Sequence, residues 1–174
     1  MHIETERKFL INMPDTEVLL GMRDCRVKQI VQTYLTIDNE TGEETRVRSI
    51  EENGKTTYVF TEKKKISAVS RFENEYAVSA DEYRRLIDEA EEPRELTKTR
   101  YAFPWGERTV EIDVYPPEIG GDGLCGKAVL EIEMEDEREK LEIPDFIEVV
   151  RELTGTKEFS NKTLALPIKK AKKV

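Results

Sequence analysis

Residues that build disulfide scaffolds and zinc sites are scarce in this sequence. Its 174 residues include two cysteines, Cys25 and Cys125, and one histidine, His2. The cysteines lie far apart in the chain, and His2 has no cysteine or second histidine near it. We therefore expect two reduced cysteines, a histidine without a metal, and a fold that does not depend on disulfides.

Long apolar segments are also missing. No run of about 18 apolar residues occurs, and the N-terminus lacks the apolar stretch of a secretory signal. We expect a cytoplasmic protein with no membrane partner. The 37 acidic residues outnumber the 28 basic ones, for a net charge of -9, so a general nucleic-acid binder with a broad basic surface is not expected either.

Charge of both signs is abundant. Charged residues make up 37% of the chain, against about 25% in an average globular protein. Many charges must therefore lie close to other charges. The length favours one domain, which we place at residues 1–168. Residues 169–174 contain the one basic run, KKAKK, and we expect a disordered tail there.

Turn signals and alternating residues predict an α+β protein built on an antiparallel sheet. The predicted strands cover residues 3–11, 27–38, 43–51, 56–64, 69–78, 96–103, 108–115 and 127–135. Asn53-Gly54 predicts a tight hairpin between the third and fourth of them. Three helices are predicted: 15–22 with Asp15 as N-cap, 81–91 after the capping box that starts at Ser79, and 146–154 between Asp145 and Gly155.

Seven of the eight predicted strands have one ionic face, with most of the apolar residues on the other face, because successive side chains of a strand alternate. The ionic faces carry the acids Glu4, Glu6, Glu73, Glu75, Glu111, Asp113, Glu131 and Glu133, and the bases Lys8, Arg46, Arg48, Lys63, Arg71, Lys98 and Arg100. A single strand of this kind is most simply part of an antiparallel sheet with one solvent-exposed face. Repeated over seven strands, the pattern favours a closed barrel with the ions inside, covered outside by helices such as 81–91 and 146–154.

The charged interior predicts a ligand. Confined ions cost several kcal/mol each unless they are paired, so internal ion pairs or a bound ion must compensate them. The two E-x-E pairs suit hard cations such as Mg²⁺ or Mn²⁺. The Arg and Lys side chains suit phosphate oxygens. A polyphosphate chelated by a metal satisfies both groups.

The ordered motifs resemble the CYTH domain, or triphosphate tunnel metalloenzyme, superfamily. They are E-x-E-x-K at 4–8, QTYL at 32–35, R-x-R at 46–48, T-x-K at 61–63, R-x-E-x-E at 71–75, KTRY at 98–101, E-x-D at 111–113 and E-x-E at 131–133. The resemblance spans residues 3–166, and the segments ERKFL and NKTLAL look most like the small prokaryotic tripolyphosphatase-type branch. It implies an eight-stranded antiparallel β-barrel, a tunnel with a charged interior, that acts on triphosphates with Mg²⁺ or Mn²⁺.

The resemblance also implies roles for single residues. Glu4, Glu6 and Glu133 would hold the metal, supported by Glu131. Glu73, Glu75, Glu111 and Asp113 would hold a second metal or position the attacking water, and Lys8 would take part in catalysis. The substrate would be bound by Lys8, Tyr34, Arg46, Arg48, Lys63, Arg71, Lys98, Arg100 and Lys157. For Lys157, on a short plug helix near one tunnel mouth, a solvated lysine beyond a helix end is the alternative.

The expected function is metal-dependent hydrolysis of a triphosphate by in-line attack of water. Inorganic tripolyphosphate is the first candidate substrate, followed by nucleoside or thiamine triphosphates. Two alternatives stay open: a class IV-type adenylyl cyclase that makes cyclic AMP from ATP, and a non-catalytic protein that binds polyphosphate or nucleotides. The sequence leaves open whether the protein is a monomer or a homodimer.

Overall fold

The predicted strands form one antiparallel sheet. The computed structural model describes residues 2–136 and 138–169, except for the side chains of His2 and Glu4. Residues 170–174 of the predicted tail lie outside the described residues. All eight predicted strands are confirmed: β1 His2–Asn12, β2 Arg26–Ile37, β3 Glu44–Glu52, β4 Lys55–Lys65, β5 Ser70–Val78, β6 Arg94–Trp105, β7 Arg108–Val114 and β8 Lys127–Met134.

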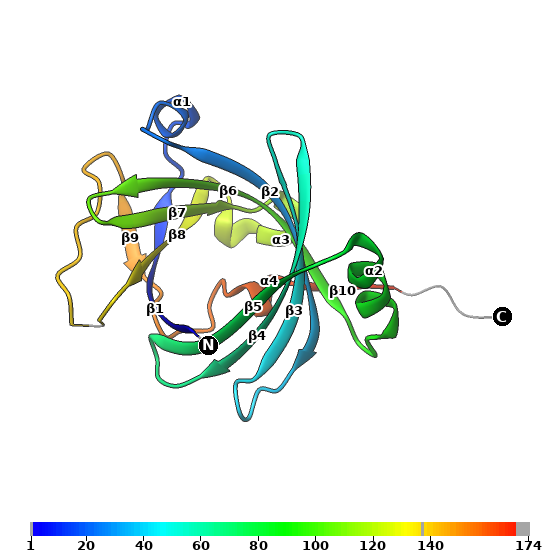
Figure 1. The fold of residues 1–174 in the computed structure, drawn as a ribbon. Helices are drawn as coiled ribbons and strands as arrows, with labels where there is room; N and C mark the ends of the chain where they lie inside the picture. The colour runs from blue at the N-terminus through cyan, green and yellow to red at the C-terminus, as the bar shows by residue number, and fades with distance from the viewer. Residues whose placement is uncertain (1, 137, 170–174) are drawn as a thin grey trace.

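The sheet closes into a barrel, as predicted. Its strand order is β6-β2-β3-β4-β5-β1-β8-β7, and pairing between β6 and β7 completes the ring. Every pairing along this path is antiparallel. Figure 1 shows the strands enclosing a central space. Closure leaves each long strand with neighbours on both sides, so the ionic faces are turned to a common interior.

The β3–β4 hairpin turns at Asn53 and Gly54, as the sequence predicts. The two residues have φ of +53° and +78°. A two-residue turn of this kind needs positive φ at both central positions, where asparagine and glycine pay little steric cost. The turn pairs Glu52 with Lys55 and thereby sets the register that brings Arg46 opposite Thr61.

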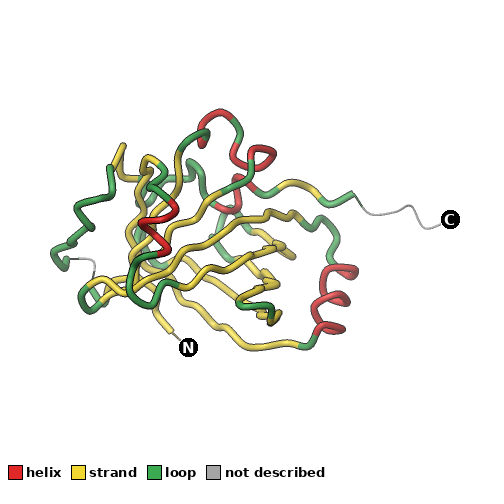
Figure 2. The backbone as a smooth tube through the Cα atoms, turned by 90° about the horizontal axis from the view of Figure 1, so that it is seen from above, coloured by secondary structure: helices red, strands yellow, loops and turns green. Residues whose placement is uncertain are grey.

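Two of the predicted helices are confirmed. α1 (Thr16–Leu20) is capped by Asp15, whose side chain accepts a hydrogen bond from the backbone N–H of Glu17. α2 (Ala80–Glu89) is capped by Ser79, which accepts from the backbone N–H of Glu82. Figure 2 shows the two helices well apart on the outside of the barrel. No helix within residues 2–136 and 138–169 is long and apolar enough to span a membrane.

The predicted helix 146–154 is wrong. Val149–Glu152 instead forms strand β9, which pairs with residues 9–11 of β1. The reason is the edge of β1: β5 pairs only with its residues 2–5, so the backbone groups beyond them need another partner. Two adjacent β-branched residues, Val149 and Val150, favour the extended conformation.

Three short helical turns and one short strand complete the part of the chain that the structure describes. They are α3 Pro117–Gly120, the 3₁₀ turn η1 Asp122–Leu124, α4 Asn161–Leu164 and β10 Leu166–Pro167, which pairs with β6. Ser160 caps α4 by accepting from the backbone N–H of Thr163. The segment that carries α4 is the part of the C-terminal chain that reaches the barrel interior.

Apolar side chains form two clusters. One lies on the outer face of the barrel and includes Ile11, Phe103, Ile112, Leu130 and Ile132, covered by Leu19 of α1 and Ile147. The second contains Leu10, Leu96 and Val129, which share the inward face with Lys8, Lys98 and Glu131, together with Leu153, Leu164 and Ala165 of the C-terminal segment. One part of the interior is therefore a second core, and the ions occupy the rest.

Candidate active site

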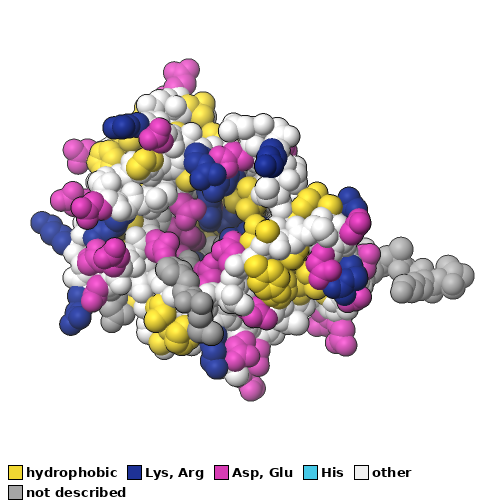
Figure 3. Space-filling model, in the orientation of Figure 1, with side chains coloured by type: hydrophobic (Ala, Val, Ile, Leu, Met, Phe, Trp, Pro, Cys, Tyr) yellow, Lys and Arg dark blue, Asp and Glu magenta, His cyan; other side chains and the backbone are white. Residues whose placement is uncertain are grey.

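The remaining interior is a cavity of about 360 Å³, called the interior cavity below. Figure 3 shows a hollow in the molecular surface with Lys, Arg, Asp and Glu side chains gathered in it. The cavity is lined by Glu6, Lys8, Lys28, Ile30, Tyr34, Glu44, Arg46, Arg48, Ile50, Lys63, Arg71, Glu73, Glu75, Arg100, Glu111, Glu131, Glu133, Ser160, Asn161 and Lys162. Most of the residues proposed from the sequence are thus brought together, and this volume is within the range of small-molecule sites.

Acidic residues of β1 and β8 form one wall of the interior cavity, called the acidic wall. Cross-strand pairing places Glu6 opposite Glu133 and Lys8 opposite Glu131. The Lys8 Nζ atom lies 3.3 Å from Glu6 Oε1 and 3.5 Å from Glu131 Oε1. Burial lowers the pKa of Lys8, but the carboxylates of Glu131 and Glu6 outweigh it and raise the pKa above its usual value. Lys8 is therefore a firmly charged ammonium group.

Two further ion pairs extend this arrangement onto β5. Arg71 Nη1 donates to Glu6 Oε1 at 3.1 Å, and Lys63 Nζ lies 3.5 Å from Glu73 Oε2. Glu75 also lines the interior cavity. Glu6, Glu73 and Glu131 each have a cation within 4 Å, so any metal bound here would compete with protein ammonium and guanidinium groups.

Basic residues of β2, β3 and β6 form another part of the lining of the interior cavity, called the basic wall. It consists of Lys28, Arg46, Arg48 and Arg100. Burial lowers the pKa of Arg48, and the positive charges of Arg46 and Arg100 lower it further. Burial likewise lowers the pKa of Lys28, with Arg26 and Arg100 adding to the effect. These cations destabilise one another, and a bound anion would relieve that repulsion.

Arg48 is held by a short chain of polar side chains. Its Nε atom donates to Gln32 Oε1 at 2.8 Å, and Gln32 Nε2 donates to the Tyr34 hydroxyl at 2.7 Å. Gln32 and Tyr34 are the polar and aromatic members of the QTYL motif, and both are buried. The motif therefore orients a guanidinium group of the basic wall.

Lys98 and Asp113 were predicted to contact the substrate and to take part in catalysis, respectively, but they lie behind the lining of the interior cavity. Their side chains are fully buried, and Lys98 Nζ donates to Asp113 Oδ2 at 2.8 Å. Asp113 also accepts from Arg100 Nε at 2.7 Å and from Arg100 Nη2 at 2.9 Å. Burial, only partly offset by Asp113, lowers the pKa of Lys98 to about 7. Asp113 thus orients Arg100 from beneath the wall.

Arg100 also links the two walls. Its Nη1 atom lies 2.6 Å from Glu111 Oε2, and its Nη2 atom lies 3.8 Å from Glu131 Oε2. Burial raises the pKa of Glu111, although the charge of Arg100 opposes the shift. Glu111 is therefore a stronger base than an ordinary glutamate when it is ionised.

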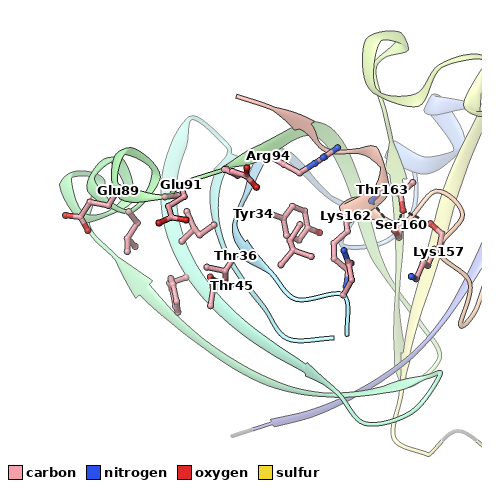
Figure 4. A pocket seen from close by; sticks show the side chains of 17 residues that line it. Tyr34, Thr36, Thr45, Glu89, Glu91, Arg94, Lys157, Ser160, Lys162 and Thr163 are labelled. Atoms are coloured by element: carbon pink, nitrogen blue, oxygen red, sulfur yellow. Dashed lines mark hydrogen bonds between the residues drawn. The ribbon is translucent and has the colours of Figure 1, made fainter. Parts of the chain in front are cut away.

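An outer groove of about 890 Å³ adjoins the interior cavity and shares Tyr34, Ser160 and Lys162 with it. Figure 4 shows Glu89 and Glu91 on one side of Tyr34 and Lys157 and Lys162 on the other. Lys157 lines this groove but not the interior cavity. Inside the barrel the cation contributed by the C-terminal segment is Lys162 of α4, and the substrate contact of Lys157 stays a prediction.

Sequence reasoning missed seven residues of the lining: Lys28, Ile30, Glu44, Ile50, Ser160, Asn161 and Lys162. Strand alternation contained a signal for two of them, because Lys28 shares a face with Tyr34, and Glu44 shares one with Arg46. Asn161 and Lys162 belong to a helix of a single turn, which has no periodic signal. Lys162 Nζ lies 4.0 Å from Glu44 Oε1.

A preformed metal site is absent among the described side chains: no three of their carboxylate, thiol and imidazole groups lie close enough together to hold a metal. Glu4, one of the predicted ligands, has its side chain outside the described residues. Glu6, Glu131 and Glu133 still share one wall on adjacent strands. Their carboxylate oxygens are the donors that hard divalent cations prefer, so the residue types fit such an ion.

Fold and site together define a closed antiparallel barrel with an ionic cavity suited to an anion and a hard cation. The model of the CYTH domain matches residues 2–165, and the chain belongs to the CYTH domain family. An inorganic triphosphatase of Acetivibrio thermocellus is 30% identical over 133 residues, which cover 76% of this chain and 77% of that protein.

Solved structures show the same fold. The PH1819 protein from Pyrococcus horikoshii OT3 superposes with a TM-score of 0.58 at 22% identity and covers 78% of this chain and 80% of its own. A conserved hypothetical protein from Pyrococcus furiosus superposes with a TM-score of 0.54 at 15% identity, with the same coverage of both chains. These similarities support the barrel architecture, and the site is argued from its residues.

Proposed function

We propose that the protein hydrolyses a triphosphate in the interior cavity, with inorganic triphosphate as the first substrate. The observation that carries this proposal is the division of one cavity into an acidic wall and a basic wall, in which burial and neighbouring cations lower the pKa values of Arg48 and Lys28. An anion of high charge density relieves the basic wall, and a divalent cation neutralises the acidic wall. The inorganic triphosphatase relative of Acetivibrio thermocellus supports the same substrate class.

The basic residues would bind the phosphate oxygens. Arg46, Arg48 and Arg100 offer guanidinium groups that can donate in pairs, whereas Lys8, Lys63 and Lys162 offer compact charges. Arg71 would complete the set beside Glu6. Tyr34 acts through Gln32 on Arg48, and Lys98 acts through Asp113 on Arg100. Tyr34 and Lys98 are therefore positioning residues in this proposal.

Glu6, Glu131 and Glu133 would hold Mg²⁺ or Mn²⁺, and Glu4 remains a predicted fourth ligand. When bound, such an ion neutralises charge on the phosphate oxygens that it contacts. Lys8 lies between Glu6 and Glu131, so its ammonium group occupies the side of the acidic wall where a phosphate oxygen would approach. Lys8 would thus keep the two carboxylates near each other and bind the substrate at the same time.

The reaction would be an in-line attack of water on the terminal phosphorus. A new bond forms between the water oxygen and phosphorus, the bond to the bridging oxygen breaks, and diphosphate leaves with the electron pair. Glu111 is the candidate to receive the proton of the water, because burial raises its pKa. Glu73 and Glu75 would position the water or hold a second metal. Arg100, fixed by Asp113, would stabilise the charge on the phosphoryl oxygens.

The experiment is a product assay on the purified protein with Mg²⁺ or Mn²⁺. Inorganic triphosphate, ATP, GTP and thiamine triphosphate are compared for release of orthophosphate, and the ATP reaction is also analysed for cyclic AMP. Release of orthophosphate from inorganic triphosphate, lost in Glu133→Ala, supports the proposal. Cyclic AMP as the product of ATP would show a cyclase, and tight binding without turnover would show a sensor.

A further inference from the structure

Asn161, the first residue of α4, lies at the floor of the interior cavity. Its side-chain oxygen Oδ1 accepts a hydrogen bond from the Tyr115 hydroxyl at 2.5 Å and a second, longer one from Lys98 Nζ at 3.4 Å. All three residues are buried. Asn161 begins the segment NKTLAL, to which the sequence analysis assigned no site residue, yet it lines the same cavity as the basic wall.

The two hydrogen bonds determine which way the amide group faces. Lys98 Nζ donates to Asp113 Oδ2 at 2.8 Å and, at 3.4 Å, also to the amide oxygen, so both contacts of the Asn161 side chain are made by its oxygen. Burial raises the pKa of Tyr115 well above its usual value, so its hydroxyl is protonated and donates. The amide oxygen is thus fixed toward the floor, and the Nδ2 group is directed away from it. Within the described residues Nδ2 makes no hydrogen bond.

A neutral donor is favourable at this position. Lys162, the next residue, already has a lowered pKa, chiefly through burial, with further contributions from Arg71, Lys157 and Lys65. Another cation here would add repulsion in the protein without substrate. The Asn161 amide supplies two N–H donors at no cost in charge, as an anion-binding site in a crowded field of cations requires.

We propose that Asn161 is a substrate-binding residue, whose Nδ2 group donates to a phosphate oxygen in the interior cavity, and that Tyr115 and Lys98 position it. The inference rests on the proposed function, because it takes a phosphate anion as the ligand. It extends the anion site from the barrel strands to α4. The C-terminal segment then contributes a neutral donor at Asn161 beside the charge of Lys162.

The test is calorimetric titration of the intact protein with inorganic triphosphate, without turnover, in wild type and Asn161→Asp. Aspartate has the same shape, and one of its oxygens keeps the contacts with Tyr115 and Lys98. The other oxygen then faces the phosphate in place of a donor. We expect binding to weaken about tenfold or more, the loss for a hydrogen bond to a charged group, with an unchanged or higher melting temperature.

Asn74→Asp is the matched control. It makes the same chemical change on the exposed face of β5, between Glu73 and Glu75, whose side chains point into the cavity. We expect Asn74→Asp to bind inorganic triphosphate with the affinity of wild type. A second variant, Tyr115→Phe, removes one hydrogen bond to Oδ1 and should weaken binding less than Asn161→Asp. Wild-type affinity in both Asn161→Asp and Tyr115→Phe would overturn the inference. If Asn161→Asp does not fold, the Tyr115→Phe result decides.

The proposed function fails separately from this inference. A wild-type protein that neither binds nor hydrolyses inorganic triphosphate contradicts the proposed function and the inference with it. A wild-type protein that binds it, together with an Asn161→Asp variant of equal affinity, contradicts only the role of Asn161.

Discussion

Asp113 should be the residue on which the stability of the barrel interior depends most. Its buried carboxylate compensates two cations, Lys98 and Arg100, and accepts three hydrogen bonds of 2.7 to 2.9 Å from them. In Asp113→Asn the negative charge is lost. One carboxylate oxygen is replaced by an NH₂ group, which is itself a donor and faces the donors of Lys98 and Arg100. Breaking a buried ion pair by removing one partner costs about 3–5 kcal/mol.

This loss is a large part of the stability of a typical domain, which is about 5–15 kcal/mol. Urea denaturation followed by circular dichroism would measure it as a lower midpoint. Glu52→Gln is the control, because Glu52 binds Arg26 in a pair of equally short hydrogen bonds on the surface. Surface pairs contribute at most about 1 kcal/mol, so Glu52→Gln should change the free energy of unfolding little.

A double variant tests the cause of the loss. If the uncompensated charge is responsible, Lys98→Met combined with Asp113→Asn should recover part of the stability, because one of the two unpaired cations is gone. The double variant would then lose less free energy of unfolding than the sum of the losses in the two single variants. Equal stability of Asp113→Asn and Glu52→Gln, or a double variant that shows the full sum, would refute this account of the interior.

Three further outcomes are expected. Lys8→Ala should abolish hydrolysis of inorganic triphosphate while the circular dichroism spectrum stays that of the folded protein; an unchanged rate would contradict its assignment. The charges of Arg100 and Lys98 overcome burial and hold the pKa of Asp113 below its usual 3.8, so the folded state binds fewer protons than the unfolded chain. The contribution of Asp113 to stability is therefore complete above pH 3.8 and is lost as the pH falls through the lowered pKa. Denaturation measured at several acid pH values should show a weaker dependence of stability on pH in Asp113→Asn than in wild type. Gly54→Ala should lower the free energy of unfolding by about 1 kcal/mol, because φ at Gly54 is +78°, and a midpoint equal to that of wild type would argue against strain at this turn.

The sequence by itself determined the strands, the hairpin at Asn53-Gly54 and the inward ionic face. Alternation of side chains is a local property with a period of two, so eight strands and the lining residues Glu6, Arg46 and Glu131 could be read from the chain. The order of the motifs added the family, which the match over residues 2–165 confirms. The predicted roles of the single residues stay predictions until they are tested.

Only the tertiary structure decided how deep each ion lies and how the C-terminal chain is used. Val149–Glu152 became a strand because β1 had an open edge, a partner that no local pattern reveals. Lys98 and Arg100 share one face of a strand, but they differ in how deeply they are buried. Lys98 is enclosed by Asp113 and Asn161, whereas Arg100 lines the interior cavity. The placement of Asn161 against Lys98 and Tyr115 joins residues far apart in sequence, and the free energy of such contacts depends on closing the barrel first.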